Sequence, residues 1–223
     1  MNIVELCLLI GIILLLVISQ LLITATYNKY SNIETSLPST GKEIVENMLN
    51  ANAITDVELG YTNGTLDDHY NPKYKTINLS KNSYKTNSVA AIAVAAHETG
   101  HAIQDHTNYS MLKLRKFLGP ICVVSSKLVW VFIFIGIILQ MFNLVVVGLI
   151  LMGITILFQI ITLPVEFDAS RRAVHYLETV GYDKETMKGI RKMLKAAAFT
   201  YVASTLAALM QMIRLILNLN TRD

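Results

Sequence analysis

The sequence predicts an α+β membrane protein that is mainly helical. Three observations carry this prediction: 53% of the 223 residues are hydrophobic against 16% charged, the apolar residues gather in long stretches, and one polar segment between them has short alternating patterns. Soluble domains usually contain about 25% charged residues. The composition therefore excludes a disordered chain and argues against a purely soluble enzyme. A net charge of +3 is no signature of nucleic-acid binding, so nucleic acid is not an expected partner.

The N-terminal segment, residues 1–26, is predicted to be a transmembrane helix. Residues 6–26 are almost all apolar and are just long enough to cross a hydrocarbon core, which takes about 20 residues. A cleaved signal peptide is the alternative interpretation. Such peptides begin with basic residues and have an apolar run of about 7–15 residues, and this segment has neither feature. An uncleaved helix is therefore favoured.

The polar segment, residues 27–117, is predicted to be a small domain of strands and helices. Gly41 opens a stretch with apolar residues at helical spacing. Val57, Leu59 and Tyr61 alternate with polar residues, as do residues 75–80, and these patterns predict short strands. Ser88 is a good N-cap for an alanine-rich helix that continues to about residue 104.

Two further apolar stretches follow the polar domain. Residues 118–163 are too long for one crossing and suit a transmembrane hairpin with a turn near 140–143. Residues 164–195 are charged and are predicted to be helical, with a break at Gly181. Residues 196–223 are predicted to form a last apolar helix that spans the membrane. A helix lying in the membrane interface is the alternative for this last segment.

The distribution of basic residues predicts the orientation in the membrane. Nine Lys and Arg residues fall in 27–117 and seven in 164–195, but none falls before residue 27 or in the turn at 140–143. The positive-inside rule places segments rich in Lys and Arg in the cytoplasm. We therefore expect a multi-pass protein of the cell membrane with both charged segments on the cytoplasmic side.

The most informative motif is the HExxH sequence from His97 to His101. Residues i and i+4 share a face of a helix, so both imidazoles can bind one cation, while Glu98 lies about 100° round the helix beside the open position. This is the zincin arrangement, with two His ligands and a Glu as general base. It predicts that residues 27–117 form a zincin-like catalytic domain with one Zn²⁺ per chain. The alternative is a pair of surface histidines on a helix.

A catalytic zinc site needs a third protein ligand. Position 107 is Thr, where a metzincin would have a third His, and His106 points about 140° away from His101. The acidic candidates are Asp105, Glu166, Asp168 and Glu178. Topology favours Glu166, the first acidic residue after the hairpin returns to the catalytic face. It follows Pro164, which suits the first turn of a helix, where a carboxylate is favourable.

Three stretches resemble the YugP-like neutral zinc metallopeptidases of bacterial membranes: Asp68-His69-Tyr70, Ala95-Ala96-His97-Glu98-Thr99-Gly100-His101-Ala102-Ile103-Gln104 and Leu163-Pro164-Val165-Glu166-Phe167-Asp168-Ala169-Ser170-Arg171-Arg172-Ala173. The similarity covers nearly the whole chain, and residues 196–202 also look familial. The family more distantly resembles the HtpX-like and CAAX prenyl proteases, which are gluzincins.

In gluzincins the third ligand is a Glu in a downstream helix, in a pattern close to Glu-Phe-x-Ala-Asp. The resemblance therefore implies Glu166 as the third ligand and makes residues 164–195 the third-ligand segment. Position 170 is Ser where the wider clan has Asp. Ser170 and Asp168 are the candidates for the hydrogen-bonding role of that Asp near the site.

These features predict an integral-membrane zinc endopeptidase that acts on a peptide or protein substrate. The metal ligands are His97, His101 and Glu166, and Glu98 is the general base toward a metal-activated water. A zinc-stabilised membrane scaffold or adaptor without peptidase activity is the alternative. Structural zinc sites usually use cysteine, and both cysteines of this chain lie in apolar stretches. The scaffold alternative is therefore disfavoured. An intramembrane peptidase of the site-2 type is disfavoured because the segment around the motif is charged.

Several further residues are candidates for supporting roles. By residue type, the transition-state oxyanion could be stabilised by His69, Tyr70, His175 or Tyr201. Arg171-Arg172 either pair with Asp168 or orient substrate, or they form a charge pair at the membrane interface. Residues 75–80 either form an edge strand beside the cleft that could pair with an extended peptide, or a plain strand within the sheet.

Overall fold

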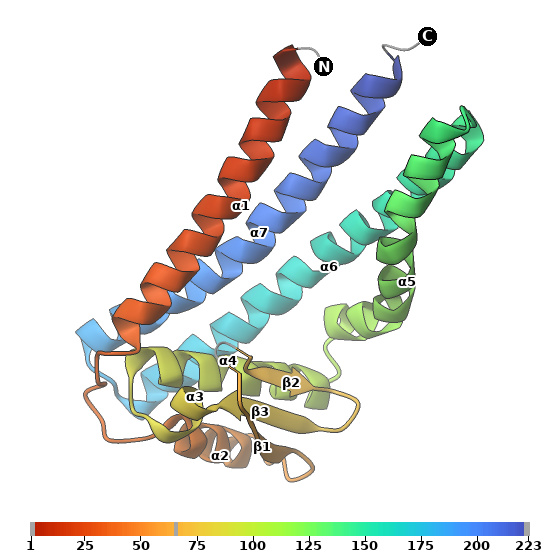
Figure 1. Cartoon of the computed structure of the whole chain (residues 1–223). Helices are drawn as coiled ribbons and strands as arrows, with labels where there is room; N and C mark the ends of the chain where they lie inside the picture. Colours follow the sequence, from red (N-terminus) through yellow and green to blue (C-terminus); the bar gives the residue numbers. More distant parts are fainter. Residues whose placement is uncertain (1–2, 65–66, 221–223) are drawn as a thin grey trace. The chain divides into compact units, whose positions relative to one another are not determined.

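The computed structural model describes residues 3–64 and 67–220 (Figure 1). The elements in chain order are α1 (Ile3–Tyr30), α2 (Gly41–Ala51), β1 (Glu58–Thr62), β2 (His69–Asn71), β3 (Thr76–Ser80), α3 (Lys81–Lys85), α4 (Val89–His106), α5 (Ser110–Ile138), α6 (Phe142–Val180) and α7 (Lys184–Asn220). Long helices dominate and one small sheet is present, which confirms the predicted α+β membrane fold.

The chain forms two compact units. The first contains residues up to 20, residues 113–164 and residues from 200 onward, and the second contains residues 21–112 and 165–199. The helices α1, α5, α6 and α7 each contribute residues to both units. The first unit holds most of the apolar helix length, and the second holds the sheet and the HExxH motif.

Four helices of the described chain, α1, α5, α6 and α7, are long and apolar enough to cross a membrane. Their outward faces carry large apolar side chains, for example Leu14, Ile18, Phe134 and Ile150, which are about half exposed or more. Such surfaces are stable against lipid but not against water. The four helices are therefore candidate membrane spans, and whether the last one crosses the membrane or lies in its interface stays a prediction.

The hairpin of α5 and α6 closes through a tight turn at residues 139–141, which confirms the predicted turn. Gln140 adopts a left-handed conformation with φ of 55°, and the N–H of Met141 donates to the carbonyl of Gly136 at 2.8 Å. Gly148 lies where a Cβ would come 3.1 Å from the carbonyl oxygen of Val129. Small residues at such contacts let membrane helices approach each other closely.

The helix that carries Glu166 begins much earlier than the sequence suggested. Pro164 was expected in the first turn of a new helix, but it lies inside α6, which runs unbroken from Phe142 to Val180. The expectation was wrong because the surrounding residues continue the helix and tolerate the missing N–H of the proline. The predicted break at Gly181 is confirmed, and this glycine has a φ of 93°.

The sheet has three strands in the order β1-β3-β2. β1 runs parallel to β3, and β2 runs antiparallel to it. The interpretation of residues 75–80 as an edge strand is therefore wrong, because β3 occupies the centre and pairs on both sides. The two edges of the sheet are β1 and the three-residue β2. Side-chain alternation predicts a strand but not its neighbours, which depend on distant segments.

The core of the second unit packs helices against this sheet. Ile44 and Val45 of α2, Ile77 of β3 and Ile92 of α4 are fully buried in one cluster. The alanine-rich start of α4 contributes small buried side chains to the same cluster. Ser88 caps α4, since its side chain accepts a hydrogen bond from the N–H of Ala91.

Helix α2 begins with a capping box between Thr40 and Glu43. The Thr40 hydroxyl accepts from the N–H of Glu43, and the Glu43 carboxylate accepts from the N–H of Thr40 at 2.7 Å. We predict that Thr40→Ala lowers the free energy of unfolding by about 1 kcal/mol, because this substitution leaves the N–H of Glu43 without its partner.

The measurement is thermal unfolding of the detergent-solubilised protein, followed by circular dichroism. Thr40→Ser keeps the hydroxyl and is the matched control. Equal melting temperatures for Thr40→Ala and Thr40→Ser would show that the cap does not contribute to stability.

Candidate metal centre

Helix α4 places both imidazoles of the motif on one side. His97 and His101 are one turn apart, and their rings lie 4.8 Å apart between centroids in an edge-to-face arrangement. The spacing predicted this juxtaposition, because residues i and i+4 share a helix face.

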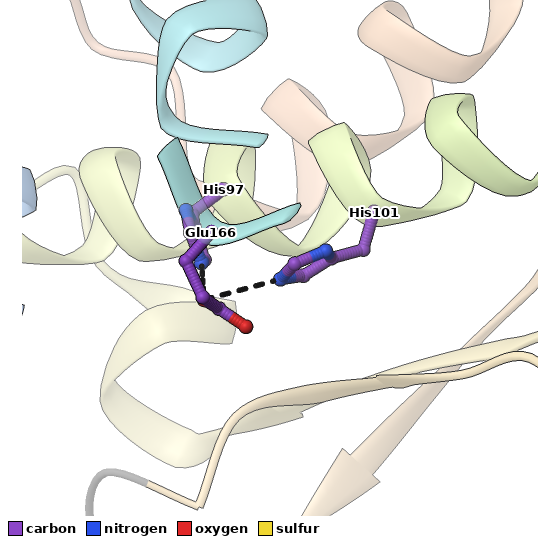
Figure 2. A group of neighbouring side chains, drawn as sticks. All are labelled: His97, His101 and Glu166. Atoms are coloured by element: carbon purple, nitrogen blue, oxygen red, sulfur yellow. Dashed lines mark hydrogen bonds and ion pairs between the residues drawn. The ribbon is translucent and has the colours of Figure 1, made fainter. Parts of the chain in front are cut away.

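Helix α6 brings Glu166 to the same place. Its Oε2 atom lies 3.2 Å from Nε2 of His97 and 3.6 Å from Nε2 of His101. Dashed lines in Figure 2 join Glu166 to both imidazoles. One donor atom from each residue lies within 4.8 Å of the others, and no second group of this kind occurs among the described residues. All three residues belong to the second unit. The structure thus brings together the three side chains that the sequence named as metal ligands.

The donor set and its spacing fit a zinc ion. Zinc binds imidazole nitrogen and carboxylate oxygen at about 2.0–2.2 Å, and a tetrahedral arrangement then separates the donors by about 3.3 Å. The two distances from Glu166 Oε2 lie close to that value, and all three donor atoms lie within 4.8 Å of one another. Two imidazoles and one carboxylate are also ligands that zinc accepts readily. A zinc ion bound by these three residues would keep one coordination position for a water or substrate atom.

The close approach of α4 and α6 makes this cluster possible. Gly100 lies where a Cβ atom would come 2.6 Å from the carbonyl oxygen of Ala169. The absence of a side chain at Gly100 therefore lets the two helices meet at the site. Glu166 is only 2% exposed as a result, and His101 is 8% exposed.

Glu98 lies on the same helix in a buried setting. Its Oε2 atom accepts a hydrogen bond of 2.9 Å from the N–H of Tyr70 in the edge strand β2. Burial raises the pKa of Glu98, while the charges of the neighbouring imidazoles oppose this rise. A carboxylate whose pKa lies above its usual range is a better proton acceptor near neutral pH.

Each imidazole also has a partner for its other nitrogen. The Ser170 hydroxyl lies 3.1 Å from Nδ1 of His97, and Oε1 of Gln104 lies 3.0 Å from Nδ1 of His101. Such outer partners orient metal ligands. Ser170 therefore occupies the helper position that sequence reasoning considered for it. The HExxH motif does not identify Gln104 as a partner of His101, although a polar residue one turn after His101 on a buried helix is a usable signal.

Asp168 contacts Gln104 and not an imidazole. Its carboxylate accepts from Nε2 of Gln104 at 3.0 Å and from Nε of Arg172 at 2.6 Å, and it also pairs with Arg171. The interpretation of Arg171-Arg172 as partners of Asp168 is therefore confirmed.

The other acidic candidates for a metal ligand have different partners. Asp105 forms a salt bridge of 2.7 Å with Lys75, and Glu178 pairs with Arg191. His106 at the end of α4 is exposed, as its helical angle predicts.

The structure directs two of the oxyanion candidates to other partners. The Tyr70 hydroxyl donates to Asp105 at 2.7 Å, and the ring of His69 contacts the carbonyl of Asp67 and the amide of Asn78. His175 is exposed on α6. Tyr201 belongs to the first unit. Oxyanion stabilisation by any of the four stays a prediction.

Comparison with known proteins agrees with the geometry. Residues 5–220 match the family described as "Putative neutral zinc metallopeptidase". The chain belongs to this family. It is also 38% identical over 207 residues to the "Putative membrane protease YugP" of Bacillus subtilis (strain 168), which covers 92% of each chain. No solved structure matches the chain. Family membership implies zinc as the metal and peptides as the class of substrate.

The contact at Gly100 leads to a prediction about stability and metal binding. We expect Gly100→Ala to lower the melting temperature and to weaken zinc binding. The new Cβ would collide with the backbone carbonyl of Ala169, and relieving this collision requires a shift of α6. The measurements are thermal unfolding and zinc content after dialysis.

Gly153→Ala on α6 is the matched control, since a Cβ there meets nothing within 4 Å. Equal zinc retention in the two variants would contradict the proposed role of the α4–α6 contact.

Proposed function

We propose that this protein is an integral-membrane zinc endopeptidase in which His97, His101 and Glu166 hold one zinc ion and Glu98 is the general base. The observation that carries the proposal is the convergence of two imidazole nitrogens and one carboxylate oxygen within 4.8 Å. The buried carboxylate of Glu98, next to His97 in the sequence, supplies the base that hydrolysis needs.

A zinc ion held by His97, His101 and Glu166 would supply a Lewis acid that polarises a peptide carbonyl and lowers the pKa of a bound water to about 7. The residues of the chain move the protons. Glu98 accepts a proton from the attacking water and delivers it to the amine nitrogen that leaves. The N–H of Tyr70 holds Oε2 of Glu98, which leaves Oε1 to carry that proton.

The outer contacts support the orientation of the ligands. Ser170 and Gln104 hold the outer nitrogens of His97 and His101. Burial of Glu166 limits the access of bulk water to the ligand atoms. A site built in this way binds its metal with little reorganisation, which favours catalysis.

The charge distribution supports a cytoplasmic active site. Sixteen of the nineteen Lys and Arg residues lie in two segments. Residues 27–117 contain the HExxH motif, and residues 164–195 contain Glu166. The turn between α5 and α6 has no basic residue, which suits the opposite side of the membrane.

The mechanism predicts different effects for the base and for the ligands. We expect Glu98→Gln to lower the rate of hydrolysis by about 10²–10⁴-fold and to keep one zinc per chain, because the amide cannot accept the proton. His97→Ala and Glu166→Ala should lose the metal itself. Cleavage of an unfolded protein such as casein and zinc content by mass spectrometry separate these outcomes.

A Glu98→Gln protein that cleaves as fast as the wild type would refute the mechanism. Tight zinc binding without any cleavage of unfolded proteins or membrane proteins would instead favour a zinc-stabilised scaffold.

The orientation is tested by labelling single cysteines. In a background without Cys7 and Cys122, we expect Lys184→Cys to react with an impermeant maleimide only after the cell is opened. Gln140→Cys in the α5–α6 turn should react in intact spheroplasts. The reverse pattern would place the active site outside the cytoplasm.

A further inference from the structure

Gln104 is a polar side chain in the fully buried part of α4. It has no exposed surface, and it lies three residues after His101. Both N–H groups of its amide and its amide oxygen contact the surrounding protein. Its Nε2 group donates to the carbonyl of Val165 at 2.7 Å and to Oδ2 of Asp168 at 3.0 Å, and its Oε1 lies 3.0 Å from Nδ1 of His101.

The chemistry of the partners fixes which end of the amide faces which group. A backbone carbonyl can only accept hydrogen bonds. Asp168 is 4% exposed and pairs with two guanidinium groups, from Arg171 and Arg172, so its carboxylate is ionised and also only accepts. Both groups need a donor, so the NH₂ of Gln104 must face them. A flipped amide would place an oxygen against two acceptors.

The orientation of Gln104 then determines which ring nitrogen of His101 carries the proton. The amide oxygen that remains can only accept, so Nδ1 of His101 must be the donor in their hydrogen bond. A neutral imidazole with its proton on Nδ1 has its lone pair on Nε2. That nitrogen is the one that lies 3.6 Å from Oε2 of Glu166 in the ligand cluster.

His97 lacks an equivalent constraint. Its Nδ1 contacts the hydroxyl of Ser170, and a hydroxyl can donate or accept by rotation. The Ser170 hydroxyl can therefore form this hydrogen bond with either tautomer of His97 and does not favour one of them. The two metal-facing imidazoles thus differ in how strongly the protein fixes them.

We propose that Gln104 is a positioning residue that locks His101 in the Nδ1-protonated tautomer and directs Nε2 toward the metal. The chain of groups runs from Arg172 through Asp168 and Gln104 to His101. This chain connects α6 to α4 beside Glu166, so it also fixes the positions of Glu166 and His101 relative to each other. This inference rests on the proposed zinc site and adds a residue to it.

The main test replaces Gln104 by Met, which has a similar length and cannot form these hydrogen bonds. We expect the zinc dissociation constant of Gln104→Met to rise about 10–100-fold, the usual effect of removing an outer partner of a ligand. Zinc affinity is measured by competition with a chromophoric chelator in detergent, and thermal unfolding checks the fold.

Thr99→Val is the matched control on the same helix. Thr99 is also fully buried, but its hydroxyl donates only to the carbonyl of Ala95 within α4. We expect this variant to keep the wild-type zinc affinity. Equal affinities for Gln104→Met and Thr99→Val, with both proteins folded, would overturn the proposal.

A second measurement needs no variant. In zinc-loaded protein with ¹⁵N-labelled histidine, we expect His101 to bind zinc through Nε2 and to carry a proton on Nδ1 that exchanges slowly with water. Coordination of His101 through Nδ1, or fast exchange of that proton, would overturn the proposal even if Gln104→Met fails to fold. A wild-type protein that binds no zinc would refute the proposed function instead.

Discussion

The approach of α4 to α6 is the constraint on which the ligand cluster depends. Two histidines one turn apart can share a cation, but the third ligand must arrive from another helix. Gly100 places no side chain against the carbonyl of Ala169, and Gln104 donates a hydrogen bond to the carbonyl of Val165. Glu166 follows Val165 directly, so this helix contact sets the position of its carboxylate.

The buried charged and polar side chains around Glu166 hold one another in a connected set of hydrogen bonds. The carboxylate of Asp168 is paired with two arginines, the amide of Gln104 fills the space between Asp168 and His101, and Glu98 takes an N–H from β2. An unpaired buried charge costs several kcal/mol, whereas a connected network keeps its members ordered. The same network that stabilises the second unit therefore prepares the ligands for a metal.

The sequence revealed features that depend on short spacing and missed those that depend on distant segments. The HExxH face, the N-cap at Ser88 and the α5–α6 turn follow from local periodicity and turn chemistry. Pro164 misled because proline favours a first helical turn, yet a long helix with enough continuing contacts accommodates it. The strand order and the role of Gln104 depend on partners that periodicity does not reveal. Val165, for example, lies 61 residues from Gln104.

The short strand β2 also bears on how copies of this protein behave toward one another. An exposed sheet edge presents free N–H groups on which a second molecule can add a strand, and this is a common start of aggregation. Here the N–H of Tyr70 already donates to Glu98, and the strand is only three residues long. The carboxylate of Glu98 thereby occupies an N–H of this edge that a strand from a second molecule would otherwise use.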